Sequence, residues 1–170
     1  MKFKSASVGI GLSVLSNLFY ISALSTPLVN SQRVLAQDAA ASCPLPPEIA
    51  VTFLDSKCQA VKLERPQRFY RYYSSSTNKY GRYLTTNRYK TNIEVIRNLA
   101  LNQEWGNQAT TILKVTVPAG TTVYQGIVAP QTPAQCYPGG GQQTFIQDTR
   151  DPNIKWNDVG NLKIEAFSCP

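Results

Sequence analysis

The 170-residue chain contains no histidine. This absence excludes zinc hydrolysis through histidine ligands, Ser-His-Asp and Cys-His catalysis, and any mechanism that depends on an imidazole general base. The spacing of the cysteines also matches no zinc motif, so we expect no metal site. Charged residues are sparse at 16% of the chain, while 42% of residues are hydrophobic. This balance is typical of an ordinary globular domain.

The sequence also lacks an uninterrupted, strongly apolar run of the roughly 20 residues that a membrane-spanning helix needs. Residues 8–29 are apolar but contain glycines, serines and a proline, and they follow a short basic segment with Lys2 and Lys4. Small or medium residues at 34–36 then fit a signal peptidase site. We therefore predict a signal peptide over residues 1–36, a secreted or periplasmic protein, and no stable membrane anchor after cleavage. An uncleaved anchor and a lipoprotein attached through Cys43 are the less favoured alternatives.

Four cysteines are present, an even number in a small chain with a predicted export signal. Such a pattern predicts two disulfides, and four cysteines allow three pairings that spacing alone does not separate. The candidates are Cys43, Cys58, Cys136 and Cys169.

Positive charge is concentrated in one part of the chain. Cleavage after residue 36 changes the formal net charge from +7 to +4, because 14 basic and 10 acidic residues remain. Ten Lys or Arg residues but only two acidic residues lie between positions 57 and 97. Such a face attracts anions such as phosphates. A solvated basic surface explains the pattern better than nucleic-acid binding, so we expect no nucleic-acid partner.

Hydrophobic patterning predicts short strands separated by turns, with one helix. The helix is expected over 92–101, because Thr91 and Glu94 form a capping-box signature ahead of an apolar face. Strands are expected over 69–73, 81–86, 110–117, 121–129, 142–147 and 162–167, with a further short one over 49–54. Runs 110–117 and 121–129 are expected to pair as a hairpin at the centre of one antiparallel sheet.

These elements predict a small, β-rich α+β domain. Residues 37–68 are expected to form an N-terminal arm and linker, with a connection over 58–68. Residues 69–170 are expected to form the catalytic domain.

Three residues offer a chemistry that needs no metal. Arg71 carries a planar cation that suits a diphosphate, and Tyr83 can stack on a ring or bond a ribose. Gln143 follows three consecutive glycines and can hold a ribose hydroxyl or a carboxamide. Such a set could bind a dinucleotide and stabilise an oxocarbenium-like state while a cationic leaving group departs.

Taken in order, the motifs resemble the tuberculosis necrotizing toxin (TNT) family of secreted NAD glycohydrolases. The resemblance covers residues 69–147 and is carried by five segments. They are Arg71, Gly81-Arg-Tyr-Leu84, Arg97-Asn-Leu-Ala-Leu101, Val123-Tyr-Gln-Gly126 with Ala129-Pro130, and Gly139-Gly-Gly-Gln-Gln143.

The resemblance implies a fold related to ADP-ribosyltransferases and cleavage of the nicotinamide–ribose bond of NAD+ or NADP+ as substrate, without a cofactor. It implies catalytic roles for Gln143, Arg71 and Tyr83, with Gln142 as the competitor of Gln143. A toxin or effector role and an inhibitor or immunity protein as partner also follow from the resemblance. The substrate-binding residues that it implies are Gly81, Leu84, Arg97, Gly140, Gly141 and Gln142.

Three other functions remain open from the sequence. An ADP-ribosyltransferase would use the same substrate, but no Glu-x-Glu or Gln-x-Glu motif lies near Gln143. A small secreted ribonuclease would exploit the basic face and needs a base such as Glu94 or Glu104. A non-enzymatic exported binding module would use the glycine-rich loop. One cleft shared by Arg71, Tyr83 and Gln143 favours an enzyme over the binding module.

Overall fold

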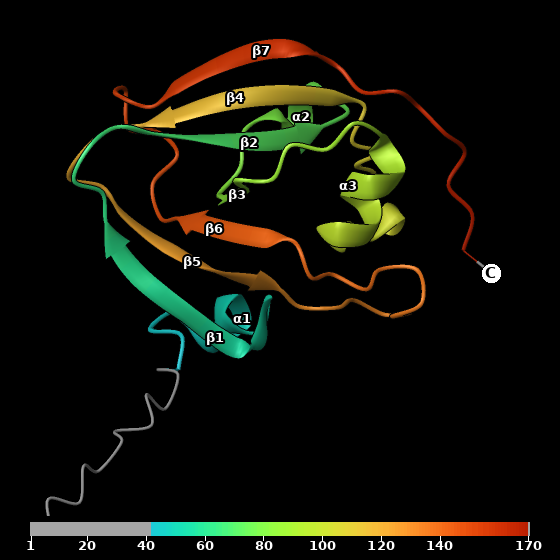
Figure 1. The fold of residues 1–170 in the computed structure, drawn as a ribbon, viewed down its shortest axis with the longest axis horizontal. Coiled ribbons are helices and arrows are strands. Elements are labelled where there is room, and N and C mark those ends of the chain that lie inside the picture. Colours follow the sequence, from blue (N-terminus) through green and yellow to red (C-terminus); the bar gives the residue numbers. More distant parts are fainter. Residues whose placement is uncertain (1–41, 170) are drawn as a thin grey trace, which may run out of the picture. The chain divides into compact units, whose positions relative to one another are not determined.

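The structure is a computed structural model that describes residues 42–169. The predicted signal peptide, residues 1–36, lies outside the described residues. Seven strands and four short helical segments make up the described part (Figure 1). The strands are β1 (Phe53–Lys62), β2 (Gln67–Tyr73), β3 (Tyr83–Leu84), β4 (Thr111–Val117), β5 (Thr122–Val128), β6 (Gln142–Ile146) and β7 (Lys155–Asn161). The helical segments are α1 (Pro47–Ala50), α2 (Ser76–Lys79), α3 (Asn92–Asn98) and the 3-10 helix η1 (Gln103–Trp105).

The strands form two antiparallel sheets that lie in separate layers, visible above and below one another in Figure 1. One sheet has the strand order β1-β5-β6-β3, and the other has the order β2-β4-β7. A single bridge between Tyr70 and Thr85 links β2 to the segment that follows β3. The predicted β-rich α+β class is confirmed, with two sheets in place of one central sheet.

The expected pairing of 110–117 with 121–129 is wrong. Strands β4 and β5 cover these runs, but β4 pairs with β2 and β7, whereas β5 pairs with β1 and β6. The turn between them carries the chain from one sheet to the other. Val115 and Val117 on β4 then pack in the same buried cluster as Val123 on β5. The alternating apolar residues therefore meet across the core, and not along a shared hydrogen-bond ladder.

Two further expectations fail at the edges of the sheets. Residues 58–68, expected as a connection, contribute to β1, which is mostly exposed because it is an edge strand paired only with β5. The polar stretch 148–158, for which no strand is predicted, provides the start of β7, another exposed edge strand. Conversely, 162–167 alternates like a strand but runs as an extended tail.

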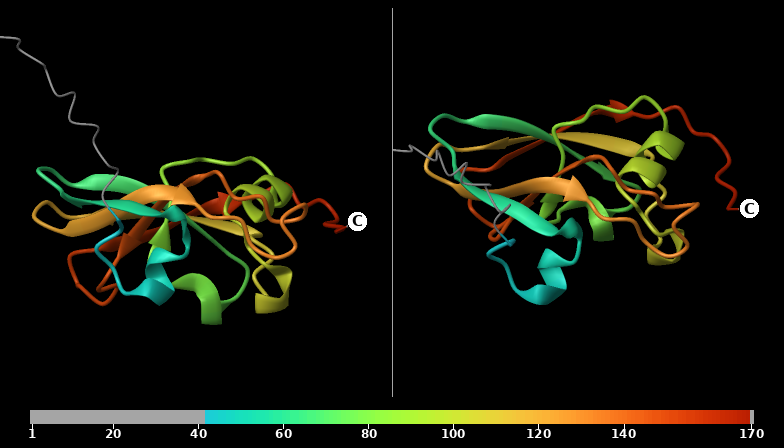
Figure 2. Two further views of the ribbon diagram at one scale, coloured as in Figure 1. Left: turned by 90° about the horizontal axis from the view of Figure 1, so that it is seen from below. Right: turned by 60° about the horizontal axis from the view of Figure 1, so that its bottom comes forward.

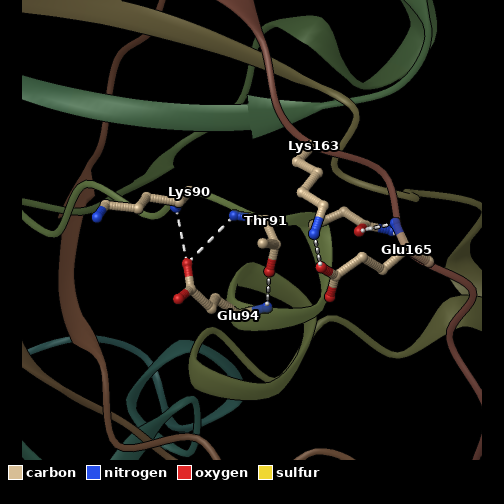
Figure 3. Close-up of polar contacts among 6 residues, drawn as sticks. Lys90, Thr91, Glu94, Lys163 and Glu165 are labelled. Carbon is tan, nitrogen blue, oxygen red and sulfur yellow. Dashed lines mark hydrogen bonds and ion pairs between the residues drawn. The ribbon is translucent and has the colours of Figure 1, made fainter.

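Helix α3 begins where the capping box predicts (Figure 3). The Thr91 hydroxyl accepts a hydrogen bond from Glu94 N at 3.2 Å, and the Glu94 carboxylate accepts from Lys90 N at 2.7 Å and Thr91 N at 3.2 Å. These backbone donors, Lys90 first, hold the pKa of Glu94 below its ordinary value. Glu94 is therefore committed to the helix start, which removes it as a candidate catalytic base.

The C-terminal tail, residues 162–169, straps this helix to the rest of the domain. The buried Asn92 side chain donates to Glu165 O at 3.0 Å and accepts from Glu165 N at 2.8 Å. Beyond it, the Phe167 ring stacks on Tyr137 with centroids 5.6 Å apart. Figure 3 shows Lys163 and Glu165 of this tail beside the start of α3. We call residues 162–169 the C-terminal strap.

Two disulfides confirm the predicted use of all four cysteines. Cys43 pairs with Cys58 next to β1, and Cys136 pairs with Cys169 at the end of the strap. Because Cys43 is bonded to another cysteine, its thiol cannot carry a lipid, which removes the lipoprotein alternative. Two disulfides fit a non-cytoplasmic protein. Within residues 42–169, no helix combines the length and apolar character needed to cross a bilayer.

Candidate functional site

A cavity of about 380 Å³ lies where strands of both sheets approach the short helical segments. In both views of Figure 2, α1 (cyan), α2 (green) and η1 (yellow) project on the same side of the sheets. Residues in or next to each of these segments reach the cavity: Thr52 after α1, Asn78 in α2 and Trp105 in η1. The full lining consists of Thr52, Tyr70, Arg71, Tyr72, Asn78, Tyr83, Leu84, Leu99, Ala100, Leu101, Trp105, Asn107, Val128, Gln131 and Gln143.

The three residues that the sequence singles out for catalysis share this cavity. Arg71 comes from β2, Tyr83 from β3 and Gln143 from β6. These positions are up to 72 residues apart in the chain (143 − 71), so only the folded sheets bring them together. A common cleft is the geometry that favours an enzyme over a binding module.

Arg71 is fixed by backbone oxygens on three sides. Its Nε donates to Lys79 O at 3.0 Å, its Nη2 to Asn78 O at 2.8 Å and its Nη1 to Tyr83 O at 3.0 Å. The glycine at 81 makes room for this arrangement, because a Cβ at Gly81 would overlap the guanidinium group. A guanidinium has five N–H donors, so two remain for a ligand.

The charge of Arg71 has no protein counter-ion within the described residues. The ion pairs found between residues 42 and 169 join other side chains, and no acidic residue lines the cavity. Burial lowers the pKa of Arg71 to about 10, so it remains protonated at neutral pH. A partly buried cation held by dipoles alone attracts an anion into the cavity.

Gln143 is 7% exposed, and Thr52 fixes its orientation. Its Nε2 donates to Thr52 Oγ1 at 2.9 Å and to Thr52 O at 3.2 Å. Because a backbone carbonyl only accepts hydrogen bonds, the amide nitrogen must face Thr52. The amide oxygen accepts no hydrogen bond from residues 42–169, so it is the group that Gln143 offers to a ligand in the cavity.

Two exposed aromatic rings stand at the cavity. Tyr83 is 36% exposed, and its ring packs on Phe145 with centroids 5.2 Å apart. Trp105 is 60% exposed on η1, which is held by hydrogen bonds from Gln103 N to the Tyr137 hydroxyl at 3.1 Å and from Gly106 N to Gln103 O at 3.0 Å. Both rings offer faces on which a planar base can stack.

Another part of the lining is apolar and adjoins α3. It consists of Leu99, Ala100 and Leu101 after the helix together with Val128 at the end of β5. Gln131 adds a side-chain amide to this lining. The cavity therefore combines a cationic part at Arg71 with an apolar part that carries amides.

The other predicted site residues differ in whether they reach the cavity. Leu84 lines the cavity, whereas Gly81, Arg97, Gly140, Gly141 and Gln142 are absent from its lining. Arg97 is exposed on α3.

The glycine loop serves the fold through its backbone. Gly139 N donates to Arg97 O at 3.0 Å, Gly140 N to Val128 O at 3.0 Å and Gly141 N to Asn98 O at 2.9 Å. The glycines therefore let their own loop lie close to α3 and to the end of β5, and these N–H groups are not available to a ligand.

Several lining residues give no motif in the sequence. Thr52 precedes β1 and Gln131 follows β5, and each is an ordinary polar residue in its local context. Trp105 does carry a signal, because an aromatic residue between polar loop residues is a recognisable candidate for a binding surface.

The sequence matches no protein-family model and no curated protein. Among solved structures, the chain is similar to Tne2 in the structure of Tne2 in complex with Tni2. The TM-score is 0.54 and the sequence identity is 14%, over 64% of this chain and 95% of that chain. This likeness shows a shared fold for the small β-rich domain with its two antiparallel sheets.

Proposed function

We propose that this protein is an NAD(P)+ glycohydrolase that cleaves the bond between nicotinamide and ribose. The observation that carries the proposal is the cavity shared by Arg71, Tyr83 and Gln143, in which Arg71 has no acidic partner among the described residues. The likeness to the TNT motifs supplies the substrate class, because those motifs include all three residues. The reaction takes NAD(P)+ as substrate and needs no cofactor.

In the proposed reaction, the two remaining N–H groups of Arg71 bind the diphosphate. Tyr83 supports a sugar or base, and the amide oxygen of Gln143 lies at the ribose, where it stabilises the positive charge that develops at C1′. The C1′–N bond breaks, and its electron pair leaves with nicotinamide, which becomes neutral. Water adds to C1′ and loses a proton, so the products are ADP-ribose, nicotinamide and H+.

The lining favours hydrolysis over the two enzymatic alternatives. ADP-ribosyl transfer usually needs a glutamate that orients the acceptor, and the described lining contains no Asp or Glu. A ribonuclease needs a base, but the candidate Glu94 is occupied by the start of α3 and the candidate Glu104 does not line the cavity. Cleavage of NAD(P)+ needs neither, because nicotinamide is already a good leaving group.

The proposal includes an exported protein with an inhibitor partner. The disulfides support an oxidising compartment. A protein partner is supported by the solved structure of a chain with this fold, Tne2, in complex with Tni2. A protein bound over the cavity mouth would block access to Arg71.

The test is the consumption of NAD+ and NADP+ by the purified, disulfide-bonded protein, beside Gln143→Ala and Gln142→Ala. Gln142 is the matched control, because it is the adjacent glutamine but is exposed and lies outside the cavity lining. We expect Gln143→Ala to lower kcat by about a hundredfold or more and Gln142→Ala to retain most of the activity. A folded parent protein that neither binds nor cleaves either dinucleotide contradicts the proposal and favours a binding module.

A further inference from the structure

We propose that Gln131 recognises the carboxamide of the nicotinamide group and so makes the cavity selective for nicotinamide dinucleotides over analogues that lack the amide. The inference rests on the proposed function and adds a specificity residue to it. No motif in the sequence points to Gln131. The structure alone places it at the cavity.

The backbone on both sides of Gln131 is anchored. Ala129 N donates to Thr52 O at 2.9 Å, and Gln131 N donates to Tyr137 O at 3.0 Å. Tyr137 in turn stacks on Phe167 of the C-terminal strap and directly follows the disulfide-bonded Cys136 in the chain. Gln131 therefore projects from a fixed loop.

The same Thr52 carbonyl oxygen holds the chain just before Gln131 close to Gln143, at the proposed reaction centre. It accepts from Ala129 N at 2.9 Å and from Gln143 Nε2 at 3.2 Å, so these two nitrogens lie no further apart than the sum, 6.1 Å. Gln131 follows two residues after Ala129. The group bonded to the reacting ribose carbon is nicotinamide, so this part of the lining is where we place the nicotinamide in the proposed complex.

The side chain of Gln131 is available for a ligand. It is half-buried, and it makes no hydrogen bond to any other residue between 42 and 169. The same cavity lining includes Val128 and residues 99–101, which are apolar. An amide without protein partners in such surroundings gains most from a ligand that satisfies it.

Nicotinamide matches this arrangement chemically. Its ring suits an apolar wall, and its carboxamide has one acceptor oxygen and an NH2 donor. The primary amide of glutamine offers the complementary donor and acceptor, so the two amides can form paired hydrogen bonds. A methyl ketone in place of the carboxamide keeps the acceptor but loses the donor, and it leaves the Gln131 oxygen without a partner.

The experiment compares kcat/KM for NAD+ and for 3-acetylpyridine adenine dinucleotide, in the parent protein, Gln131→Met and Gln135→Met. Methionine has nearly the volume of glutamine without its polar atoms. Gln135 is the control, because it lies in the same loop but is exposed and outside the cavity lining. Dividing the preference of each variant by that of the parent cancels the intrinsic reactivity of the two leaving groups.

We expect the parent and Gln135→Met to share one preference for NAD+, and Gln131→Met to reduce that preference by about tenfold. An unchanged preference in Gln131→Met would overturn the inference. Equal losses for both dinucleotides would overturn it as well, because they would place Gln131 at the adenine or assign it a structural role.

A second measurement separates this inference from the proposed function. Free nicotinamide and 3-acetylpyridine are titrated against the parent and Gln131→Met, with the shift in melting temperature as the readout. Selective stabilisation by nicotinamide that disappears in Gln131→Met supports the carboxamide site even if the parent does not cleave NAD+. Equal responses of the parent to both compounds contradict the site even if NAD+ is cleaved.

Discussion

Replacing Arg71 with lysine should weaken the binding of ADP-ribose by at least a hundredfold, although the side chain keeps its charge. Arg71 bonds three backbone oxygens and retains two N–H groups for a diphosphate. Hydrogen bonds to charged groups contribute about 1.5–3 kcal/mol each, so two of them amount to roughly 3–6 kcal/mol. An ammonium has no planar fork and cannot satisfy the three carbonyls and a diphosphate together.

The desolvation of Arg71 gives a second, independent measure of the free energy that an anion contributes on binding there. Burial lowers its pKa from the ordinary value of an arginine to about 10, which corresponds to roughly 3 kcal/mol against the charged form. An anion in the cavity offsets this penalty. The expected loss of at least a hundredfold in ADP-ribose affinity corresponds to about 2.7 kcal/mol, which is of the same size as the penalty.

The assay is isothermal titration of ADP-ribose and of adenosine against the parent protein and Arg71→Lys. Adenosine has no phosphate, so its affinity should be the same for both proteins. Far-UV circular dichroism establishes that the variant is folded. Affinities for ADP-ribose within threefold of each other would refute the assignment of Arg71 to the diphosphate.

The pH dependence follows from the same residue. The lowered pKa of Arg71 in the folded protein, about 10, still lies well above neutral pH, so Arg71 is charged there. It loses its proton as the pH rises through about 10. Diphosphate binding should therefore be constant from about pH 5 to 9 and decline above that range. In the ligand-free protein, the unfolded chain keeps the Arg71 proton to a higher pH than the folded chain, so the contribution of Arg71 to stability rises with pH above about 10. A loss of binding between pH 5 and 8 would contradict the assignment.

Three further predictions concern the surroundings of these residues. If Gln143 acts as proposed, Thr52→Val should lower kcat by about three- to tenfold, because it removes the hydroxyl that accepts from Gln143 Nε2 and donates to Ile49 O, whereas Thr52→Ser should retain the activity. Saturating ADP-ribose should change the fluorescence of the exposed Trp105, and the change should vanish in Trp105→Phe; a persistent signal would place the ligand elsewhere. Removing the Cys136–Cys169 disulfide with a double serine variant should lower the free energy of unfolding by about 3–4 kcal/mol, as chemical denaturation can measure. The same variant should have a higher KM. An unchanged KM would mean that the strap does not support the cavity.

Local patterns in the sequence predict where the strands and helices lie better than they predict which strands pair. The β-branched alternation identifies β4 and β5 almost to the residue, and the capping box identifies the start of α3, which ends three residues before the predicted 101. Pairing depends on distant strands, and no feature of the turn between β4 and β5 reveals that the chain changes sheet there. Strand β7 escapes prediction because it is an exposed edge strand without alternation.

The residues of the candidate site likewise divide into those that the sequence predicts and those that only the fold reveals. Arg71 and Gln143 stand in motifs and were predictable, whereas Thr52 is a partner of Gln143 across 91 residues of sequence. The glycines also carry a real signal, which is for close packing of backbone against α3 and β5. The sequence therefore predicts which residues are unusual, and the fold decides whether a ligand or the protein itself uses them.

The covalent closure of the strap has a consequence for proteolysis. The exposed segment between β6 and β7, residues 147–153, is where a protease would most readily cut the chain. A cut there separates β7 and the strap from the rest of the chain, yet the Cys136–Cys169 bond still joins the two pieces. The nicked protein should stay intact as a two-chain molecule under oxidising conditions and come apart once it is reduced. A passage from an oxidising to a reducing compartment would then set its lifetime.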